Sequence, residues 1–278
     1  MSKTQTLENK VSKTGRLADT FPLFEKDTIS TSIQLMNERR TNAELRNKWH
    51  YTANAGVYTN EKGKAVLYFQ KGPDNVIFNN IPESIKQLIE KGNYEVKNSD
   101  LESIVSSKET LKVELSKLKL QGTDGEWRYF EIDTSKYSKT LNKTQRAFAE
   151  KVYGEGRDFK KNMKMLSEAG ISKTKIYVLN PEYVLKNVQK GKAVGRACWL
   201  DSFLSNSNFN AYSRYVDDDN ALRGVSKGTA EGGAKNLCVI ADAYAAILAN
   251  PKEAIAQLND DKARQILNIV NSHYNKNK

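Results

Sequence analysis

The chain has few of the residues that most catalytic and metal sites require. Only two of its 278 residues are histidine and two are cysteine. His50, His273, Cys198 and Cys238 therefore leave few ways to assemble a zinc site or a His–Ser or His–Cys pair. The metalloprotease motif HExxH is absent from the sequence. The two cysteines lie far apart, which favours buried thiols over a disulfide. The sequence thus favours a protein that is not an enzyme and that carries no cofactor.

Long apolar runs are also missing. No stretch approaches the roughly 18 consecutive apolar residues that span a bilayer. The N-terminus, MSKTQTLENKVSKTGR, lacks the apolar region of a secretory signal. With 38% hydrophobic and 28% charged residues, the composition suits a soluble globular protein with a real core. We therefore expect a cytoplasmic protein, or a virion-associated one if it is viral, with no membrane partner.

Positive charge is abundant and unevenly placed. The chain has 44 basic and 33 acidic residues, which give a net charge of +11. Residues 143–196 include thirteen basic and five acidic side chains, so this stretch alone has a net charge of +8. Such an uneven field indicates a polyanionic partner, of which nucleic acid is the commonest. The sequence does not distinguish RNA from DNA.

The basic stretch is the predicted contact with nucleic-acid phosphates. Four of its residues, between 157 and 164, follow the spacing i, i+3, i+4 and i+7 and so share one face of a helix. Phe159 and Met163 fall on another face, towards a core. An ordinary solvated surface is the alternative interpretation of these charges. The predicted contact residues are Lys151, Arg157, Lys160, Lys161, Lys164, Lys173, Lys175, Lys190, Lys192 and Arg196.

Hydrophobic periodicity predicts an α+β protein. Its first half should contain a β-hairpin or small antiparallel sheet, with the hairpin turn at Asn60-Glu61-Lys62-Gly63, and its second half should be predominantly helical. Residues 1–30 should form a flexible N-terminal arm, and residues 31–140 an α+β region. Residues 141–278 should form a mainly helical basic region, either separate from residues 31–140 or continuous with them. The expected elements are helices at 81–93, 142–153 and 157–170, strands at 127–133 and 175–180, and two helices beyond residue 236.

One acidic string resembles a catalytic motif. Tyr215-Val216-Asp217-Asp218 resembles the YxDD turn of reverse transcriptases, and Asp133 ends an aromatic-rich strand as the first carboxylate of palm-domain polymerases does. The resemblance covers only these two short strings. It implies a metal-dependent enzyme in which Asp133, Asp217 and Asp218 hold two divalent cations. Polar residues on both sides of the aspartates favour an acidic turn instead.

Three functions remain open on the sequence. The leading interpretation is a non-enzymatic nucleic-acid-associated protein, such as a nucleoprotein or accessory binding protein of a virus, phage or mobile element. The first alternative is a self-assembling structural subunit of a larger assembly such as a virion. The second alternative is the polymerase-like enzyme.

Overall fold

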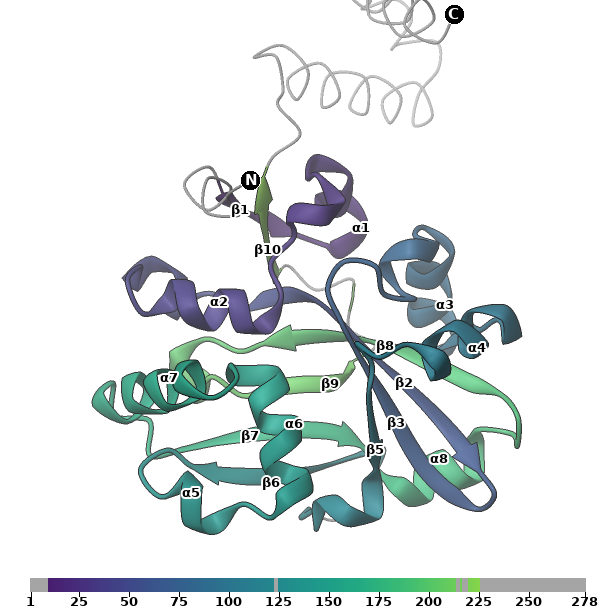
Figure 1. Ribbon diagram of the computed structural model, residues 1–278. Coiled ribbons are helices and arrows are strands. Elements are labelled where there is room, and N and C mark those ends of the chain that lie inside the picture. Colours follow the sequence, from purple (N-terminus) through teal and green to yellow (C-terminus); the bar gives the residue numbers. More distant parts are fainter. Residues whose placement is uncertain (1–9, 123–124, 214–215, 217–219, 226–278) are drawn as a thin grey trace, which may run out of the picture. The chain divides into compact units, whose positions relative to one another are not determined.

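The computed structural model describes residues 10–122, 125–213, 216 and 220–225. Within them, the strands form one ten-stranded mixed sheet (Figure 1). Its main order is β1-β10-β2-β8-β9-β7-β6, while β3 pairs with β2, β5 with β3, and β4 with β8. The strands are β1 (Lys10–Gly15), β2 (His50–Glu61), β3 (Lys64–Lys71), β4 (Tyr94–Val96), β5 (Leu111–Glu114), β6 (Trp127–Asp133), β7 (Lys173–Leu179), β8 (Ala193–Leu200), β9 (Phe209–Ser213) and β10 (Asn220–Val225).

Helices alternate with the strands along the described part of the chain. They are α1 (Leu17–Thr20), α2 (Ser32–Arg39), α3 (Glu83–Lys91), α4 (Asn98–Ser106), α5 (Tyr137–Thr140), α6 (Lys143–Tyr153), α7 (Arg157–Glu168) and α8 (Pro181–Asn187). No helix in these ranges is long and apolar enough to cross a membrane.

The hairpin of β2 and β3 forms where the sequence predicts it. Its two-residue turn places Lys62 at φ 52° and Gly63 at φ 81°. Positive φ at both positions matches the twist of the strands, and glycine adopts it without strain. Glu61 pairs with Lys64 and the register continues to Asn54 and Lys71. The hairpin then supplies β2, which also pairs with β8 and therefore lies inside the sheet.

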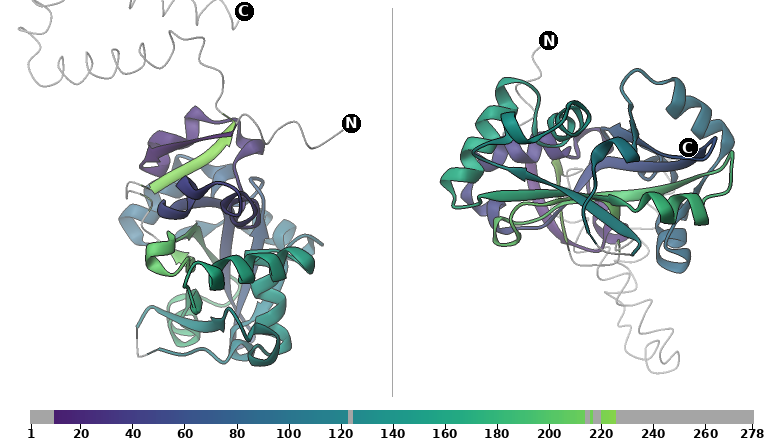
Figure 2. Two further views of the ribbon diagram at one scale, coloured as in Figure 1. Left: turned by 90° about the vertical axis from the view of Figure 1, so that its left-hand side faces the viewer. Right: turned by 90° about the horizontal axis from the view of Figure 1, so that it is seen from below.

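Two hydrophobic clusters pack on the sheet. The first includes Phe130, Phe148 and Phe159 and joins β6, β7 and β9 to α6 and α7. Figure 2 shows these two helices on one side of the sheet. The second cluster includes Ile77, Leu88 and other residues that contact β2 and β8 from α1, α3 and their neighbouring loops. This second layer covers β2 and β8. It does not include residues of β6, β7 and β9.

The expectation of a predominantly helical second half is wrong. Five strands, β6 to β10, lie between residues 127 and 225. The last six residues of strand β8, from Gly195 to Leu200, are all buried. Because both faces of this strand are covered, its sequence does not alternate between apolar and polar residues. Strand β9, FNAYS, reads as polar because one face holds Asn210 and Tyr212 while Phe209 and Ala211 enter the core. The helices expected beyond residue 236 lie outside the described residues.

Residues 10–30 belong to the segment that the sequence favours as a flexible arm. In the structure they include β1, which pairs antiparallel with β10 from Lys10–Val225 to Gly15–Asn220. Leu17, Phe24 and Ile29 are buried. Part of the N-terminal segment is thus built into one edge of the sheet.

Candidate binding surface

The outward side of β6, β7 and β9 presents aromatic side chains. Successive strand residues point to opposite faces, so Phe130 and Ile132 enter the core while Trp127 and Tyr129 point away from it. Tyr177 of β7 and Tyr212 of β9 lie beside them. We call Trp127, Tyr129, Tyr177 and Tyr212 the aromatic face.

The four rings form one connected group around Tyr177. Its ring centroid lies 5.2 Å from that of Trp127, 5.3 Å from that of Tyr129 and 6.1 Å from that of Tyr212. Trp127 stacks on Tyr212 at 5.6 Å with 26° between the planes. Offset, stacked and edge-on arrangements at these separations are the favourable geometries for aromatic pairs. The rings therefore support one another on a rigid sheet.

The hydroxyl groups of Tyr129 and Tyr177 remain available to a partner. Trp127 is 41% exposed, and the three tyrosines are half-buried. Among the described residues, nothing hydrogen-bonds the hydroxyls of Tyr129 and Tyr177. The amine of Lys175 lies 4.3 Å from the centre of the Tyr129 ring, as in a cation–π contact. Large amphipathic rings with free polar ends are the residues that dominate binding at protein interfaces.

A buried carboxyl group lies beside the aromatic face. Asp201 follows β8 and is 7% exposed. Its Oδ1 accepts a hydrogen bond of 2.9 Å from the Nδ2 of Asn210, whose strand neighbour is Tyr177. Burial raises the pKa of Asp201 to about 7, although hydrogen bonds and Arg39 oppose the rise. This carboxyl group therefore changes charge near neutral pH.

Arg39 fixes the backbone around Asp201. Its fully buried guanidinium donates to the carbonyl oxygens of Leu45 at 3.0 Å, Lys48 at 2.7 Å and Asp201 at 2.8 Å. His50 lies against the same guanidinium, with its Nδ1 3.3 Å from Nη2. Burial, followed by the charge of Arg39, lowers the pKa of His50 to about 3. His50 is thus a neutral structural residue at physiological pH.

The predicted phosphate contacts separate into several groups. Arg157, Lys160, Lys161 and Lys164 are all exposed on α7, as their helical spacing predicts. Lys164 lies 3.5 Å from Glu168. These four remain a local basic face, and the other six predicted residues lie elsewhere.

The remaining basic residues have individual surroundings. Lys151 pairs with Glu155 at 2.7 Å, and Lys173 pairs with Glu131 at the same distance. Lys175 lies on Tyr129, as described above. Lys190 and Lys192 precede β8, and Figure 1 shows the start of β8 and α7 at opposite ends of the sheet. The ten residues therefore do not form one continuous surface.

Arg196 is placed where it cannot meet a phosphate in solvent. Its side chain is fully buried, and Nη2 lies 2.5 Å from the carboxylate of Glu126. Nη1 donates to the carbonyl oxygen of Tyr212 at 2.9 Å, and Nε donates to Oδ1 of Asn93 at 3.1 Å. Its role in this structure is to join the ends of β4, β6 and β9. Sequence cannot show this, because a buried and an exposed arginine carry the same charge.

Asp133 uses its carboxylate to form a turn. Its Oδ1 accepts hydrogen bonds from the Ser135 amide at 2.9 Å, the Ser135 hydroxyl at 2.7 Å and the Lys136 amide at 2.9 Å. These hydrogen bonds lower its pKa. Asp217 and Asp218 lie outside the described residues. Within the described ranges, no group of three His, Cys, Asp or Glu side chains is arranged to hold a metal ion.

Sequence reasoning missed most of the aromatic face. The strand at 127–133 was expected, and its alternation already places Trp127 and Tyr129 on one side. Tyr177 lies in the predicted strand at 175–180, and its side chain is half-buried. The missing information was the topology, in which no helix of the described residues covers the outward side of β6, β7 and β9.

Comparison with known proteins identifies the fold and not a family. No family model matches the chain, and no curated protein matches it. A solved structure with the description "Accommodation of massive sequence variation in Nanoarchaeota by the C-type lectin fold" superposes with a TM-score of 0.55. The superposition covers 81% of this chain and 99% of that one, at 11% sequence identity. The chain therefore shares the C-type lectin fold, with strands throughout rather than a helical second half.

Proposed function

We propose that this protein is a recognition module that binds a protein partner through the aromatic face. The observation that carries the proposal is the exposure of Trp127 beside three half-buried tyrosines on a rigid strand triplet. Tryptophan and tyrosine are the commonest energetic centres of protein interfaces because they bury much apolar area and lose little conformational freedom.

Charge at this face also favours a protein over a polyanion. Lys173 is neutralised by Glu131 at 2.7 Å, and the amine of Lys175 lies on the ring of Tyr129. Interface centres are depleted in charge and enriched in aromatic residues. The paired charges around the rings match the polar rim of such an interface.

The fold supports the same proposal. The structure that it resembles is described as accommodating massive sequence variation on the C-type lectin fold. In such a fold, the inward strand residues form the core and the outward ones form the surface. The surface residues can therefore be substituted without changing the core. In this chain Phe130 and Phe209 are fully buried in the core, whereas Trp127 is 41% exposed and Tyr212 is half-buried. The aromatic face is thus a surface that can specialise without disturbing the scaffold.

A double truncation tests the proposal. The variant Trp127→Ala/Tyr177→Ala should retain the fold and lose a partner that the wild-type protein captures from cells of its source organism. Each interface centre contributes about 2 kcal/mol or more, so the dissociation constant of the purified partner should rise at least about 100-fold in calorimetry.

The matched control removes two exposed apolar side chains elsewhere. Ile89 is 53% exposed on α3 and Val105 is 51% exposed on α4. Ile89→Ala/Val105→Ala should leave the dissociation constant unchanged. Equal binding by the aromatic variant and the wild-type protein would refute the proposal, provided that circular dichroism shows both variants folded.

A second candidate function is nucleic-acid binding through α7. The observation that favours it is the common exposed face of Arg157, Lys160, Lys161 and Lys164. Lysine and arginine bind phosphates without reading sequence, and they do so by releasing counterions. This proposal keeps the α7 residues of the predicted contact set and leaves out the buried Arg196.

Salt dependence distinguishes the two candidates. If α7 binds single strands, the affinity for fluorescent single-stranded RNA or DNA should fall steeply between two salt concentrations. The slope of log K against log salt should be about −0.7 per phosphate contacted. Reversing Lys160, Lys161 and Lys164 to glutamate should weaken binding at least tenfold more than reversing the exposed Lys86, Lys108 and Lys119. Equal effects of the two triple variants would show that binding depends on the net charge of the protein and not on α7. The absence of binding at low salt would exclude this function.

A further inference from the structure

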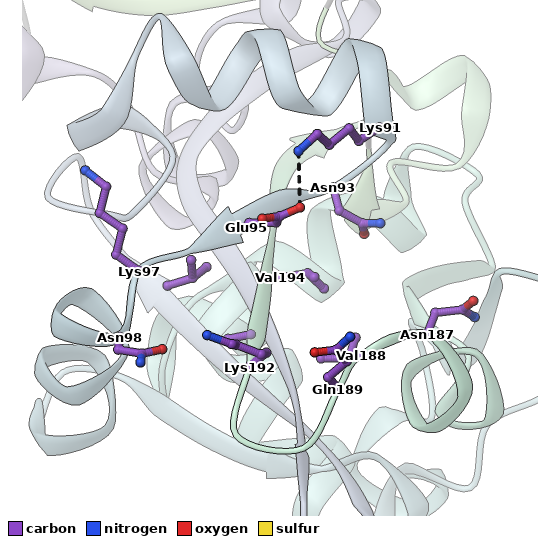
Figure 3. A pocket seen from close by; sticks show the side chains of 12 residues that line it. Lys91, Asn93, Glu95, Lys97, Asn98, Asn187, Val188, Gln189, Lys192 and Val194 are labelled. Carbon is purple, nitrogen blue, oxygen red and sulfur yellow. Dashed lines mark hydrogen bonds and ion pairs between the residues drawn. The ribbon is translucent and has the colours of Figure 1, made fainter.

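A polar hollow lies at the end of the sheet where β4 pairs with β8. Its volume is about 650 Å³, within the roughly 300 to 1,000 Å³ of small-molecule sites. Figure 3 shows Val188 and Val194 among side chains from α3, β4, the start of α4, the end of α8 and the start of β8. Three lysines and four side-chain amides line it, with a single carboxylate: Lys91, Lys97, Lys192, Asn93, Asn98, Asn187, Gln189 and Glu95.

Positive charge is in excess in this hollow. Lys91 and Glu95 neutralise each other at 3.2 Å, as the dashed line in Figure 3 marks. Lys97 and Lys192 have no carboxylate within ion-pair distance among the described residues. Other lysines of the described residues do pair with carboxylates, including Lys112 with Glu61 at 2.7 Å and Lys71 with Glu155 at 2.6 Å. The two unpaired amines therefore give the hollow a net charge of about +2 and favour an anion.

The backbone at one wall of the hollow adds further donors. The nine-residue helix α4 begins at Asn98, and no side chain caps its N-terminus. The first N–H groups of a helix have no partner within it, and the helix dipole makes this end positive. Lys97 and Asn98, at this end, both line the hollow. In Figure 3 the side chains of Asn98 and Lys192 lie across from each other in its lower part.

The opposite wall is held by a buried group. The fully buried Arg196 donates from Nε to Oδ1 of Asn93 at 3.1 Å. Because this bond engages the amide oxygen, the NH₂ group of Asn93 is left as a donor. On α8, Asn187 donates to the carbonyl of Tyr183 at 2.8 Å, so its own oxygen is left as an acceptor. The hollow thus combines fixed amides, which suit hydroxyl groups, with free cations, which suit a phosphate.

We propose that this hollow binds a small phosphorylated polyol, such as a sugar phosphate. Lys192 acts on the phosphate as a point charge, together with the start of α4. Lys97, whose side chain extends away from Lys192 in Figure 3, adds to the positive potential of the hollow. The amides of Asn93, Asn98, Asn187 and Gln189 meet the hydroxyl groups. A carboxylated sugar has fewer acceptor oxygens than a phosphorylated one and should bind more weakly. This site is separate from the aromatic face, and its existence does not depend on the protein partner.

Calorimetric titration of the full chain tests this site. The probes are glucose 6-phosphate, ribose 5-phosphate and glycerol 3-phosphate, with glucose, glucuronate and inorganic phosphate for comparison. At least one phosphorylated polyol should bind tenfold or more tightly than all three comparison compounds. Lys97→Gln/Lys192→Gln should weaken that binding at least tenfold. Lys86→Gln/Lys108→Gln, which removes two exposed lysines outside the hollow, should leave it unchanged.

Each other outcome overturns the proposal. Absence of saturable binding by all three phosphorylated probes would exclude the site. Glucuronate binding as tightly as the phosphorylated compounds would exclude the preference for phosphate. An equal loss of affinity in the two lysine variants would show that the ligand responds to the net charge of the protein and does not bind in the hollow. Because both variants change exposed side chains, neither result depends on a loss of folding.

Discussion

Replacing Arg39 by methionine is expected to lower the free energy of unfolding by about 4 kcal/mol or more. The guanidinium is fully buried and donates to three carbonyl oxygens, those of Leu45, Lys48 and Asp201. A buried acceptor that loses its donor costs about 1 to 3 kcal/mol, and methionine donates no hydrogen bond. Burial lowers the pKa of Arg39 only to about 9, so the guanidinium is charged at neutral pH and its hydrogen bonds are charge-assisted.

The neighbouring arginine provides the control for this measurement. Arg40 pairs with Asp158 at 3.0 Å, and both side chains are partly exposed. Exposed pairs of this kind contribute about 0 to 1 kcal/mol, so Arg40→Met should change the stability little. Urea denaturation followed by tryptophan fluorescence measures both variants. Equal losses in Arg39→Met and Arg40→Met would contradict the structural role assigned to Arg39.

The contrast between these two arginines shows what sequence could not reveal. Both belong to the string NERR, which reads as the end of a solvated helix. Arg39 acquires its partners only when residues 45, 48 and 201 are brought together by the fold. The periodicity of local segments predicted the hairpin, the strand at 127–133 and the helices α3, α6 and α7. Burial of a charge depends on topology, and local periodicity carries no information about it.

The same reasoning applies to the candidate surfaces. The excess of basic residues between 143 and 196 is a property of the sequence, and α7 does present its four exposed cations as predicted. The structure then separates Lys192, which lines the hollow, from Arg196, which is buried only four residues later. The aromatic face depends on which strands remain uncovered by helices. That information resides in the strand order and could not be obtained from residue spacing.

Arg196 physically connects the two proposed sites. Its guanidinium holds Asn93 of the hollow, the carbonyl of Tyr212 and the carboxylate of Glu126, which precedes Trp127. The hollow and the aromatic face therefore share a rigid support and have separate exposed residues. Substitution of Arg196 would disturb both sites at once. Binding at each site is therefore tested by substituting its own exposed side chains.

Asp201 is expected to make the stability of the protein depend on pH. Its pKa in the folded protein is raised to about 7 from an ordinary value of 3.8, and desolvation is the main cause. The folded state therefore holds the proton more tightly than the unfolded state does. This contribution to stability is fully present below about pH 4 and is lost as the pH rises through 7. A pKa difference of about three corresponds to roughly 4 kcal/mol.

The variant Asp201→Asn isolates this effect because its side chain is neutral at every pH. Measured by urea denaturation from pH 4 to pH 8, the difference in unfolding free energy between variant and wild type should shift in favour of the variant by up to about 4 kcal/mol. Any constant offset reflects rearranged hydrogen bonds with Asn208 and Asn210. The groups that act on Asp201, chiefly Arg39, remain unchanged in both proteins. The comparison also cancels the pH dependence from carboxylates whose pKa is shifted downward. One of these is Glu155, whose pKa is lowered to about 2 by Lys151 and Lys71. Parallel stability curves would show that Asp201 stays ionised throughout this range, and the buried carboxyl group beside the aromatic face would then be a permanent negative charge.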